Sequence, residues 1–182
     1  MLVSSGPGFG KSTYIPELVS LIEKIVPNFD KNKRLWICGP ENTSGDTPEA
    51  KAIEMRDSIG AKDSKTFTRE TLMKMILKNF DSYDETFKVT DGKLTGKNSD
   101  GTEKIFELDY ETGDVKFDYE LNTGLSQLPK IIIVDEISEF SQFDMTVLDD
   151  FATKNGIIVL AHGDFTQSGI YGTIKVNEGE KD

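Results

Sequence analysis

The feature that most constrains this chain is a glycine-rich segment near its start, Ser5-Gly6-Pro7-Gly8-Phe9-Gly10-Lys11-Ser12. A short apolar run at residues 2–4 precedes it. After it, apolar side chains recur at spacings of three and four, which predicts an amphipathic helix over residues 11–26. A strand, a glycine-rich turn and a helix form the context in which a phosphate-binding loop works. The segment therefore predicts a nucleotide site at the first strand-to-helix turn of an α/β fold.

The residues of this loop match the chemical requirements of phosphate binding. Small residues let successive backbone N–H groups turn toward a phosphate, and the helix N-terminus adds the positive end of its dipole. We expect Lys11 to reach the β- and γ-phosphates as a catalytic residue and the Ser12 hydroxyl to ligate Mg²⁺. Ser5 stands where the consensus has its first glycine. The predicted nucleotide-binding residues are Gly6, Pro7, Gly8, Phe9, Gly10, Lys11, Ser12 and Thr13.

A second element of the same chemistry is the pair Asp135 and Glu136, which follows four aliphatic residues at 131–134. Such a run is typical of a strand buried on both faces of a parallel sheet, so Asp135 would emerge at the strand's carboxyl end. We expect Asp135 to hold Mg²⁺ and Glu136 to orient and deprotonate the attacking water. Taken alone, the pair would be interpreted as a solvated acidic turn. Together with Lys11 and Ser12 it predicts a site for ATP and Mg²⁺.

The organisation of the remaining chain favours one α/β domain with an insertion. Apolar runs at residues 35–38 and 157–160 alternate with segments of helical periodicity, which predicts a mostly parallel sheet flanked by helices. Residues 81–128 differ, because short strand-like runs are separated there by turn residues. We therefore predict a domain made of residues 1–80 and 129–182, interrupted by an acidic β-hairpin insertion at 81–128, a candidate accessory domain.

The charge distribution separates the same regions. The chain holds 21 Lys and Arg against 32 Asp and Glu, a net charge of −11, which as a total argues against a nucleic-acid partner. Residues 1–80, however, carry a net charge of +2, whereas residues 81–128 and 129–182 carry −7 and −6. The total therefore does not exclude nucleic acid, but it predicts weak, salt-sensitive strand binding by this domain alone.

Several other features restrict the class of protein. A single cysteine, Cys38, excludes an intrachain disulfide and a multi-cysteine metal site. No run approaches the roughly 20 apolar residues of a membrane span, and no secretory signal is found, so we expect no membrane partner. The expected location is the cytoplasm of a bacterium or of a phage- or virus-infected cell. His162, the one histidine, is interpreted as a packed residue, because Glu136 already supplies a base.

Three further segments resemble motifs of superfamily 1 helicases, and the closest resemblance is to the RecD-like branch and to viral enzymes. Gly163-Asp164-Phe165-Thr166-Gln167, after the third aliphatic run, is similar to motif III. Gly39-Pro40-Glu41-Asn42-Thr43 resembles motif Ia, and the segment from Lys65 to Leu72 resembles the one that follows motif Ia. With the glycine-rich loop and Asp135-Glu136, these matches run in the family's order over nearly the whole chain. The resemblance implies a RecA-like P-loop NTPase fold.

The same resemblance implies roles for particular residues. Gln167 would act as a catalytic residue that senses the γ-phosphate, beside Lys11 and Glu136. The insertion at 81–128 occupies the place where relatives carry a small accessory domain. For Lys65 and Arg69, a solvated surface is an equally open interpretation. The residues implied to contact nucleic acid are Pro40, Asn42, Thr43, Lys65, Thr68 and Arg69.

The sequence thus predicts the first motor domain of an ATP-dependent helicase or translocase acting on single-stranded DNA or RNA. After Gln167 come Ser168 and Gly169, where the RecD-like branch has an apolar residue and proline, and nothing after Gly169 resembles a second motor domain. Since an arginine finger contributes about 10³–10⁵ in rate, the isolated chain should hydrolyse ATP slowly. We expect a fragment whose parent chain supplies the second motor domain. Two alternatives stay open, a P-loop ATPase of the packaging or assembly type and a nucleotide-gated binding module.

Overall fold

The computed structural model of the protein describes residues 2–5, 11–41, 47–80, 88–90, 93–97, 103–108, 115–117 and 119–163. Only the backbone is described for residues 2–5, 11–14, 48, 88–90, 93–94, 96–97, 103–108 and 115–116. Five strands in these residues form a central sheet in the order β1-β9-β8-β2-β3, and every neighbouring pair is parallel. The strands are β1 (Leu2–Ser5), β2 (Leu35–Cys38), β3 (Lys65–Phe67), β8 (Ile131–Asp135) and β9 (Ile158–His162). This arrangement confirms the predicted mostly parallel α/β fold.

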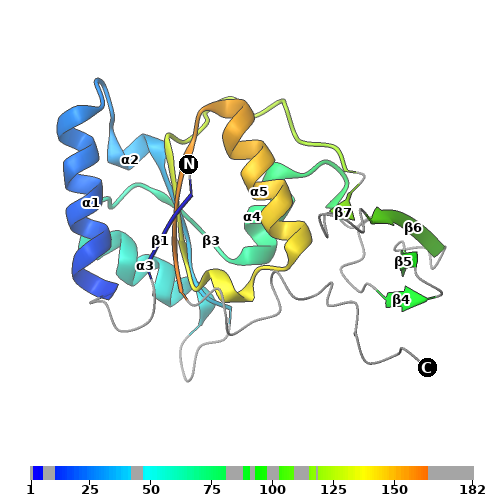
Figure 1. The fold of residues 1–182 in the computed structure, drawn as a ribbon. Coiled ribbons are helices and arrows are strands. Elements are labelled where there is room, and N and C mark those ends of the chain that lie inside the picture. Colours follow the sequence, from blue (N-terminus) through cyan, green and yellow to red (C-terminus); the bar gives the residue numbers. More distant parts are fainter. Residues whose placement is uncertain are drawn as a thin grey trace.

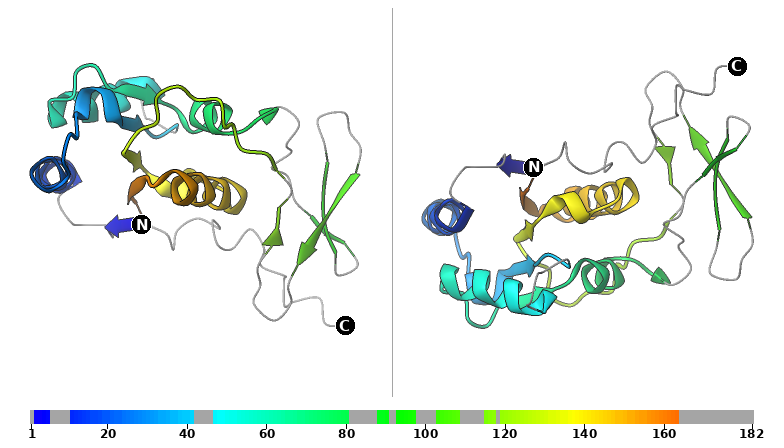
Figure 2. Two further views of the ribbon diagram at one scale, coloured as in Figure 1. Left: turned by 90° about the horizontal axis from the view of Figure 1, so that it is seen from above. Right: turned by 90° about the horizontal axis from the view of Figure 1, so that it is seen from below.

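Helices cover both faces of this sheet, which gives three layers (Figures 1 and 2). One face carries α1 (Lys11–Ile25), α2 (Lys31–Arg34) and α3 (Pro48–Ile59). The other face carries α4 (Arg69–Ile76) and α5 (Gln142–Asn155), and the short 3₁₀ helix η2 (Ile137–Glu139) follows β8. Side chains cap the starts of α2, α3, α4 and α5. At α5, Ser141 and Asp144 form a capping box.

The two hydrophobic clusters follow the alternation of side chains along the strands. In β8, Ile132 and Val134 pack with α4 and α5, whereas Ile131 and Ile133 pack with α1 and α3. Leu160 of β9 belongs to the second group. Because successive strand residues point to opposite faces, the last residues of β8 and β9, two positions further on, lie on the α1 side of the sheet.

Residues of the predicted insertion form a separate antiparallel sheet in the order β4-β5-β6-β7. Its strands are β4 (Lys88–Thr90), β5 (Lys93–Lys97), β6 (Glu103–Leu108) and β7 (Val115–Lys116). In Figure 1 this sheet lies to one side of the three layers. It is the β-rich part of the chain, and the domain boundaries around it remain a prediction.

The chain rejoins the main body immediately after β7. The rings of Phe117 and Tyr119 meet Phe143 of α5 edge-on, with centroids 5.3 and 5.9 Å apart. Backbone hydrogen bonds then join this segment to the end of α4, from Lys78 N–H to the Glu120 carbonyl (2.9 Å) and from Asn122 N–H to the Ile76 carbonyl (2.8 Å). Phe117, Tyr119 and Leu121, although inside the predicted insertion at 81–128, thus pack against the central core.

Among the helices that the structure describes, none is both long and apolar enough to span a bilayer.

Candidate nucleotide site

Three segments with predicted phosphate chemistry meet at the carboxyl edge of the central sheet. In the strand register, Ser5 of β1 pairs with His162 of β9, and His162 pairs with Asp135 of β8. Neighbouring strands are about 4.8 Å apart, so the backbones of Ser5 and Asp135 lie roughly 10 Å apart across β9. α1 begins at Lys11, six positions after Ser5. β1 therefore ends at the same edge of the sheet as Asp135, two strands away, and open parallel sheets bind their ligands at this edge.

Asp135 and His162 form a pair at this edge. His162 Nδ1 lies 3.4 Å from Asp135 Oδ1. The His162 side chain is 1% exposed, as expected for a packed residue, whereas that of Asp135 is 22% exposed. The buried ring thus lies against a carboxylate that keeps access to solvent, which is how a second residue orients a metal-ligating carboxylate.

Glu136 has a constrained position directly after Asp135. Its backbone is left-handed (φ 64°, ψ 62°), a conformation that residues other than glycine adopt only where the surroundings enforce it. The Ser138 hydroxyl donates a hydrogen bond to Glu136 Oε1. On the other side, Gly163 comes so close that a Cβ atom built there would lie 2.8 Å from Glu136 Oε1. The proposed base is therefore fixed between η2 and the residue after β9.

A comparison with known families agrees with this geometry. The family model for an AAA domain matches residues 1–173, nearly the whole chain. The chain belongs to the AAA-domain family. This is a P-loop domain of the kind found in RecD-like helicases, and with the parallel sheet it confirms the predicted RecA-like P-loop fold. Neither a curated protein nor a solved structure shows significant similarity to the chain.

Membership of the AAA-domain family implies that the chain binds a nucleotide, usually together with Mg²⁺. The described residues fit such a group, because a partly exposed carboxylate, Asp135, lies at the edge from which the phosphate loop departs. A carboxylate oxygen is also the kind of ligand that Mg²⁺ prefers. Other predicted site residues lie outside the described part of the AAA domain: Gly6, Pro7, Gly8, Phe9, Gly10, Asn42, Thr43 and Gln167, and the side chains of Lys11, Ser12 and Thr13.

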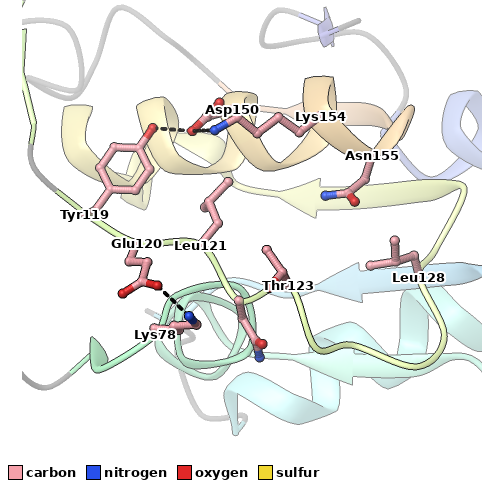
Figure 3. Close-up of a pocket in the computed structure, with 10 residues that line it drawn as sticks. Lys78, Tyr119, Glu120, Leu121, Thr123, Leu128, Asp150, Lys154 and Asn155 are labelled. Atoms are coloured by element: carbon pink, nitrogen blue, oxygen red, sulfur yellow. Dashed lines mark hydrogen bonds and ion pairs between the residues drawn. The ribbon is translucent and has the colours of Figure 1, made fainter.

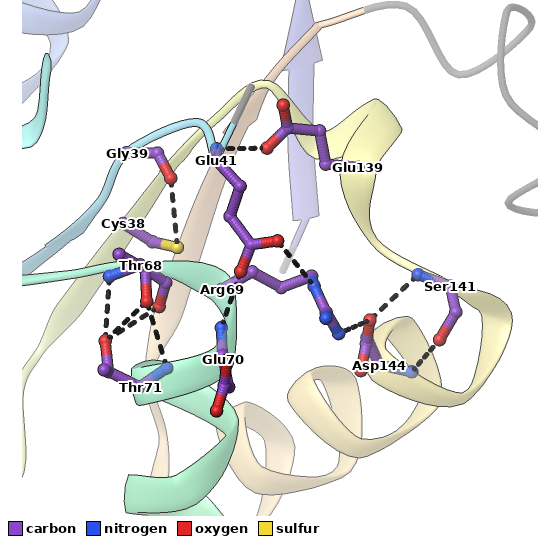
Figure 4. Close-up of polar contacts among 10 residues, drawn as sticks. All are labelled: Cys38, Gly39, Glu41, Thr68, Arg69, Glu70, Thr71, Glu139, Ser141 and Asp144. Carbon is purple, nitrogen blue, oxygen red and sulfur yellow. Dashed lines mark hydrogen bonds and ion pairs between the residues drawn. The ribbon is translucent and has the colours of Figure 1, made fainter. Parts of the chain in front are cut away.

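Arg69 of the AAA domain, implied by resemblance to contact nucleic acid, is engaged by two carboxylates. Its Nη1 lies 3.0 Å from Asp144 Oδ2, and its Nε lies 3.5 Å from Glu41 Oε2 (Figure 4). Asp144 is fully buried and also accepts the Ser141 N–H at 2.9 Å. A phosphate would have to compete with both carboxylates, so the structure supports neither of the two interpretations weighed from sequence. The local sequence contains no sign of this cluster, because its partners are 28 and 75 positions from Arg69.

The other described residues of the implied strand-binding set are spread along the sheet. Pro40 follows the carboxyl end of β2, and Thr68 caps α4 by accepting the Thr71 N–H on its Oγ1 at 3.2 Å. Lys65 begins β3 opposite Trp36, about 13 Å back along the sheet from Pro40, and its Nζ lies 6.0 Å from the Trp36 ring. The structure thus places Pro40 and Thr68 near the carboxyl edge and Lys65 further from it.

A pocket of about 380 Å³ lies away from the nucleotide edge (Figure 3). Its walls include the ion pairs Lys78–Glu120 and Lys154–Asp150, and the Tyr119 hydroxyl donates to Asp150 at 2.7 Å. The other residues that line it are Leu121, Asn122, Thr123, Leu128 and Asn155. These residues come from the ends of α4 and α5 and from the segment before β8, which lie at the amino edge of a parallel sheet. The pocket contains none of the predicted nucleotide residues.

Proposed function

We propose that this AAA domain is the first, ATP-binding motor domain of a superfamily 1-like helicase or translocase that moves along single-stranded DNA or RNA. One observation supports the proposal most directly: Gly163, the start of the segment that resembles motif III, lies against Glu136. A P-loop ATPase of the packaging or assembly type would need Lys11 and Asp135 equally, but it has no need of a motif III beside the base.

The proposed hydrolysis assigns one step to each residue. The backbone of the glycine-rich loop and the Lys11 ammonium would bind the phosphates, and Ser12 and Asp135 would hold Mg²⁺. The metal ion, when bound, neutralises charge on the phosphate oxygens. Glu136 would orient a water molecule and take its proton as the water oxygen bonds to the γ-phosphorus and the bond to the β-phosphate oxygen breaks. His162 would hold Asp135 in place.

The proposed partners are a single strand and a second motor domain. Pro40, Asn42, Thr43 and Thr68 would contact the strand at the carboxyl edge, and Lys65 would add a positive charge further along. Arg69 is left out of this set, because Glu41 and Asp144 engage its guanidinium. The second motor domain would supply the arginines that complete the site, and hydrolysis by this chain alone would be slow.

Two substitutions test the nucleotide chemistry. Lys11→Ala should abolish binding of a fluorescent ATP analogue in the presence of Mg²⁺. Glu136→Gln should keep the affinity but lower the single-turnover hydrolysis rate by about 10²–10⁴, the usual contribution of a general base. Lys24→Ala, at the exposed last turn of α1, is the matched control and should change neither quantity.

The results distinguish the proposed function from its rivals. Hydrolysis that is unaffected by Lys11→Ala or by Glu136→Gln would contradict the assigned site. In the parent protein, ATP turnover that rises with single-stranded nucleic acid supports the motor. Turnover that rises only with a protein partner would instead support an assembly ATPase.

A further inference from the structure

The loop after β2 is attached to the turn after β8 by a hydrogen bond between two glutamates. Glu41 donates its backbone N–H to Glu139 Oε2 at 2.6 Å (Figure 4). Glu139 is the last residue of η2, three positions after Glu136, and the two bonded residues are 98 positions apart in the chain. A hydrogen bond to a carboxylate is stronger than one between neutral groups. The backbone of Glu41 is therefore positioned by the turn that carries the proposed base.

The side chain of Glu41 binds to a different element, helix α4. Its Oε1 accepts the backbone N–H of Glu70 at 3.1 Å, in the first turn of α4, where the helix dipole favours a negative charge. Its Oε2 faces Arg69, which is bound in turn to the buried Asp144 at the start of α5. The carboxylate of Glu41 is thus held by α4 and α5, while its N–H is held by η2.

We propose that Glu139 is a positioning residue that links nucleotide binding at Asp135 and Glu136 to the order of the loop at residues 39–41. This inference rests on the proposed function, since it needs a nucleotide at that edge. The loop leads into Asn42 and Thr43, which are proposed to contact the strand. Glu139 would be the contact through which the nucleotide site controls that loop.

The proposed link depends on the shortness of η2, because Glu139 lies only three positions after Glu136. The left-handed backbone of Glu136 and its hydrogen bond from Ser138 make the start of η2 a constrained unit. A nucleotide that engages Asp135 and Glu136 restricts this unit, and with it the carboxylate of Glu139. The side chain of Glu41 is anchored on α4, so its N–H cannot follow a shift of η2. The hydrogen bond between Glu41 and Glu139 therefore strengthens when η2 is held still.

Hydrogen exchange of the Glu41 amide measures this bond directly. With Mg²⁺ and a non-hydrolysable ATP analogue, the wild-type amide should exchange about tenfold more slowly or more, the effect of a charge-assisted hydrogen bond. In the Glu139→Ala variant, the Glu41 amide should exchange faster than in the wild type without nucleotide. Its exchange rate should not change when nucleotide is added. Glu139→Gln keeps an acceptor oxygen and should recover most of the response. Glu54→Ala, on the exposed side of α3, is the control and should respond as the wild type does.

Nucleotide affinity, titrated on the same samples, separates two kinds of failure. A wild-type chain that binds the analogue without slowing the Glu41 amide overturns the inference and leaves the proposed function standing. A Glu139→Ala variant that responds like the wild type overturns the inference as well. If Glu139→Ala does not fold, a folded Glu139→Gln variant without a response overturns it in the same way. A wild-type chain with no affinity for the analogue overturns the proposed function together with the inference.

Discussion

Gly163→Ala should both destabilise this AAA domain and slow its hydrolysis of ATP, because the position next to Glu136 has no room for a methyl group. An added Cβ would lie 2.8 Å from Glu136 Oε1, 3.1 Å from the Ile137 backbone nitrogen and 3.3 Å from Glu136 Cα. Gly163 also has φ +129°, a conformation that side-chain-bearing residues rarely adopt. Steric contact and backbone strain therefore both disfavour a side chain at residue 163.

The magnitude follows from these two contributions. A strained backbone costs about 1–3 kcal/mol, and overpacking in a closed site adds about 1–3 kcal/mol. The end of the Glu136 side chain can rotate away at the expense of its hydrogen bond from Ser138, but the Ile137 nitrogen belongs to the backbone and has less freedom to move. We expect the free energy of unfolding to fall by about 2–6 kcal/mol. Because the base is displaced, the hydrolysis rate should fall by about 10²-fold.

Gly156→Ala is the matched control. Gly156 is also left-handed (φ +63°), but a Cβ there would meet nothing within 4 Å, so only backbone strain of about 1–2 kcal/mol applies. Urea unfolding followed by circular dichroism measures stability, and single-turnover assays with protein in excess measure hydrolysis. If Gly163→Ala is no less stable than Gly156→Ala and hydrolyses ATP at the wild-type rate, the close packing of Gly163 against Glu136 is refuted.

Three further predictions concern buried or partly buried side chains. Arg69→Ala should lower the free energy of unfolding by roughly 3 kcal/mol, because it leaves the buried Asp144 carboxylate without its cation, whereas Lys74→Ala on the exposed side of α4 should cost under about 1 kcal/mol. Burial raises the pKa of Tyr119, and the hydrogen bond to Asp150 of α5 raises it further. The phenol therefore contributes its full stabilisation below the ordinary phenol pKa, and this stabilisation is lost as the pH rises above that value. Stability measured against pH should therefore fall less steeply at alkaline pH in Tyr119→Phe. Burial raises the pKa of the Cys38 thiol, so a thiol reagent at mildly alkaline pH should label the native chain far more slowly than the urea-unfolded chain.

Each of these expectations has a contrary result. Equal stability losses for Arg69→Ala and Lys74→Ala would mean that the guanidinium is not part of the fold. Identical pH profiles for the wild type and Tyr119→Phe would remove the assigned role of the phenol. Rapid labelling of Cys38 in the native chain would show that β2 opens easily.

Much of the fold was predictable because buried strands and helices leave recognisable patterns of apolar residues in the sequence. The aliphatic run at residues 131–134 is buried on both faces of the sheet, which is why it indicated a central parallel strand. The run at 157–160 predicted β9 but not its full length. The strand continues through His162, a polar residue that is buried because it lies between β1 and β8. Hydrophobic patterning cannot reveal a strand end of that kind.

The environment of the site was less predictable, because its contacts join residues far apart in the chain. Arg69 stands in a segment that resembles a strand-binding motif, yet its guanidinium is engaged by Glu41 and Asp144. The same holds for Glu139, whose partner is the backbone of Glu41. A backbone N–H carries no residue identity, so no sequence pattern could have indicated this bond. The closeness of Gly163 to Glu136 likewise depends on how two loops meet.

The position of β9 between β1 and β8 has a consequence for how the chain becomes functional during its synthesis. In the described sheet, β1 pairs only with β9, so β1 is synthesised more than 150 residues before the strand that becomes its partner. Until then the glycine-rich loop has no fixed relation to Asp135, because β9 alone separates and aligns the two strands. Folding of the core can start from β2, β3 and β8, which pair without β9. We therefore expect competence to bind nucleotide to arise only after β9 has inserted between β1 and β8.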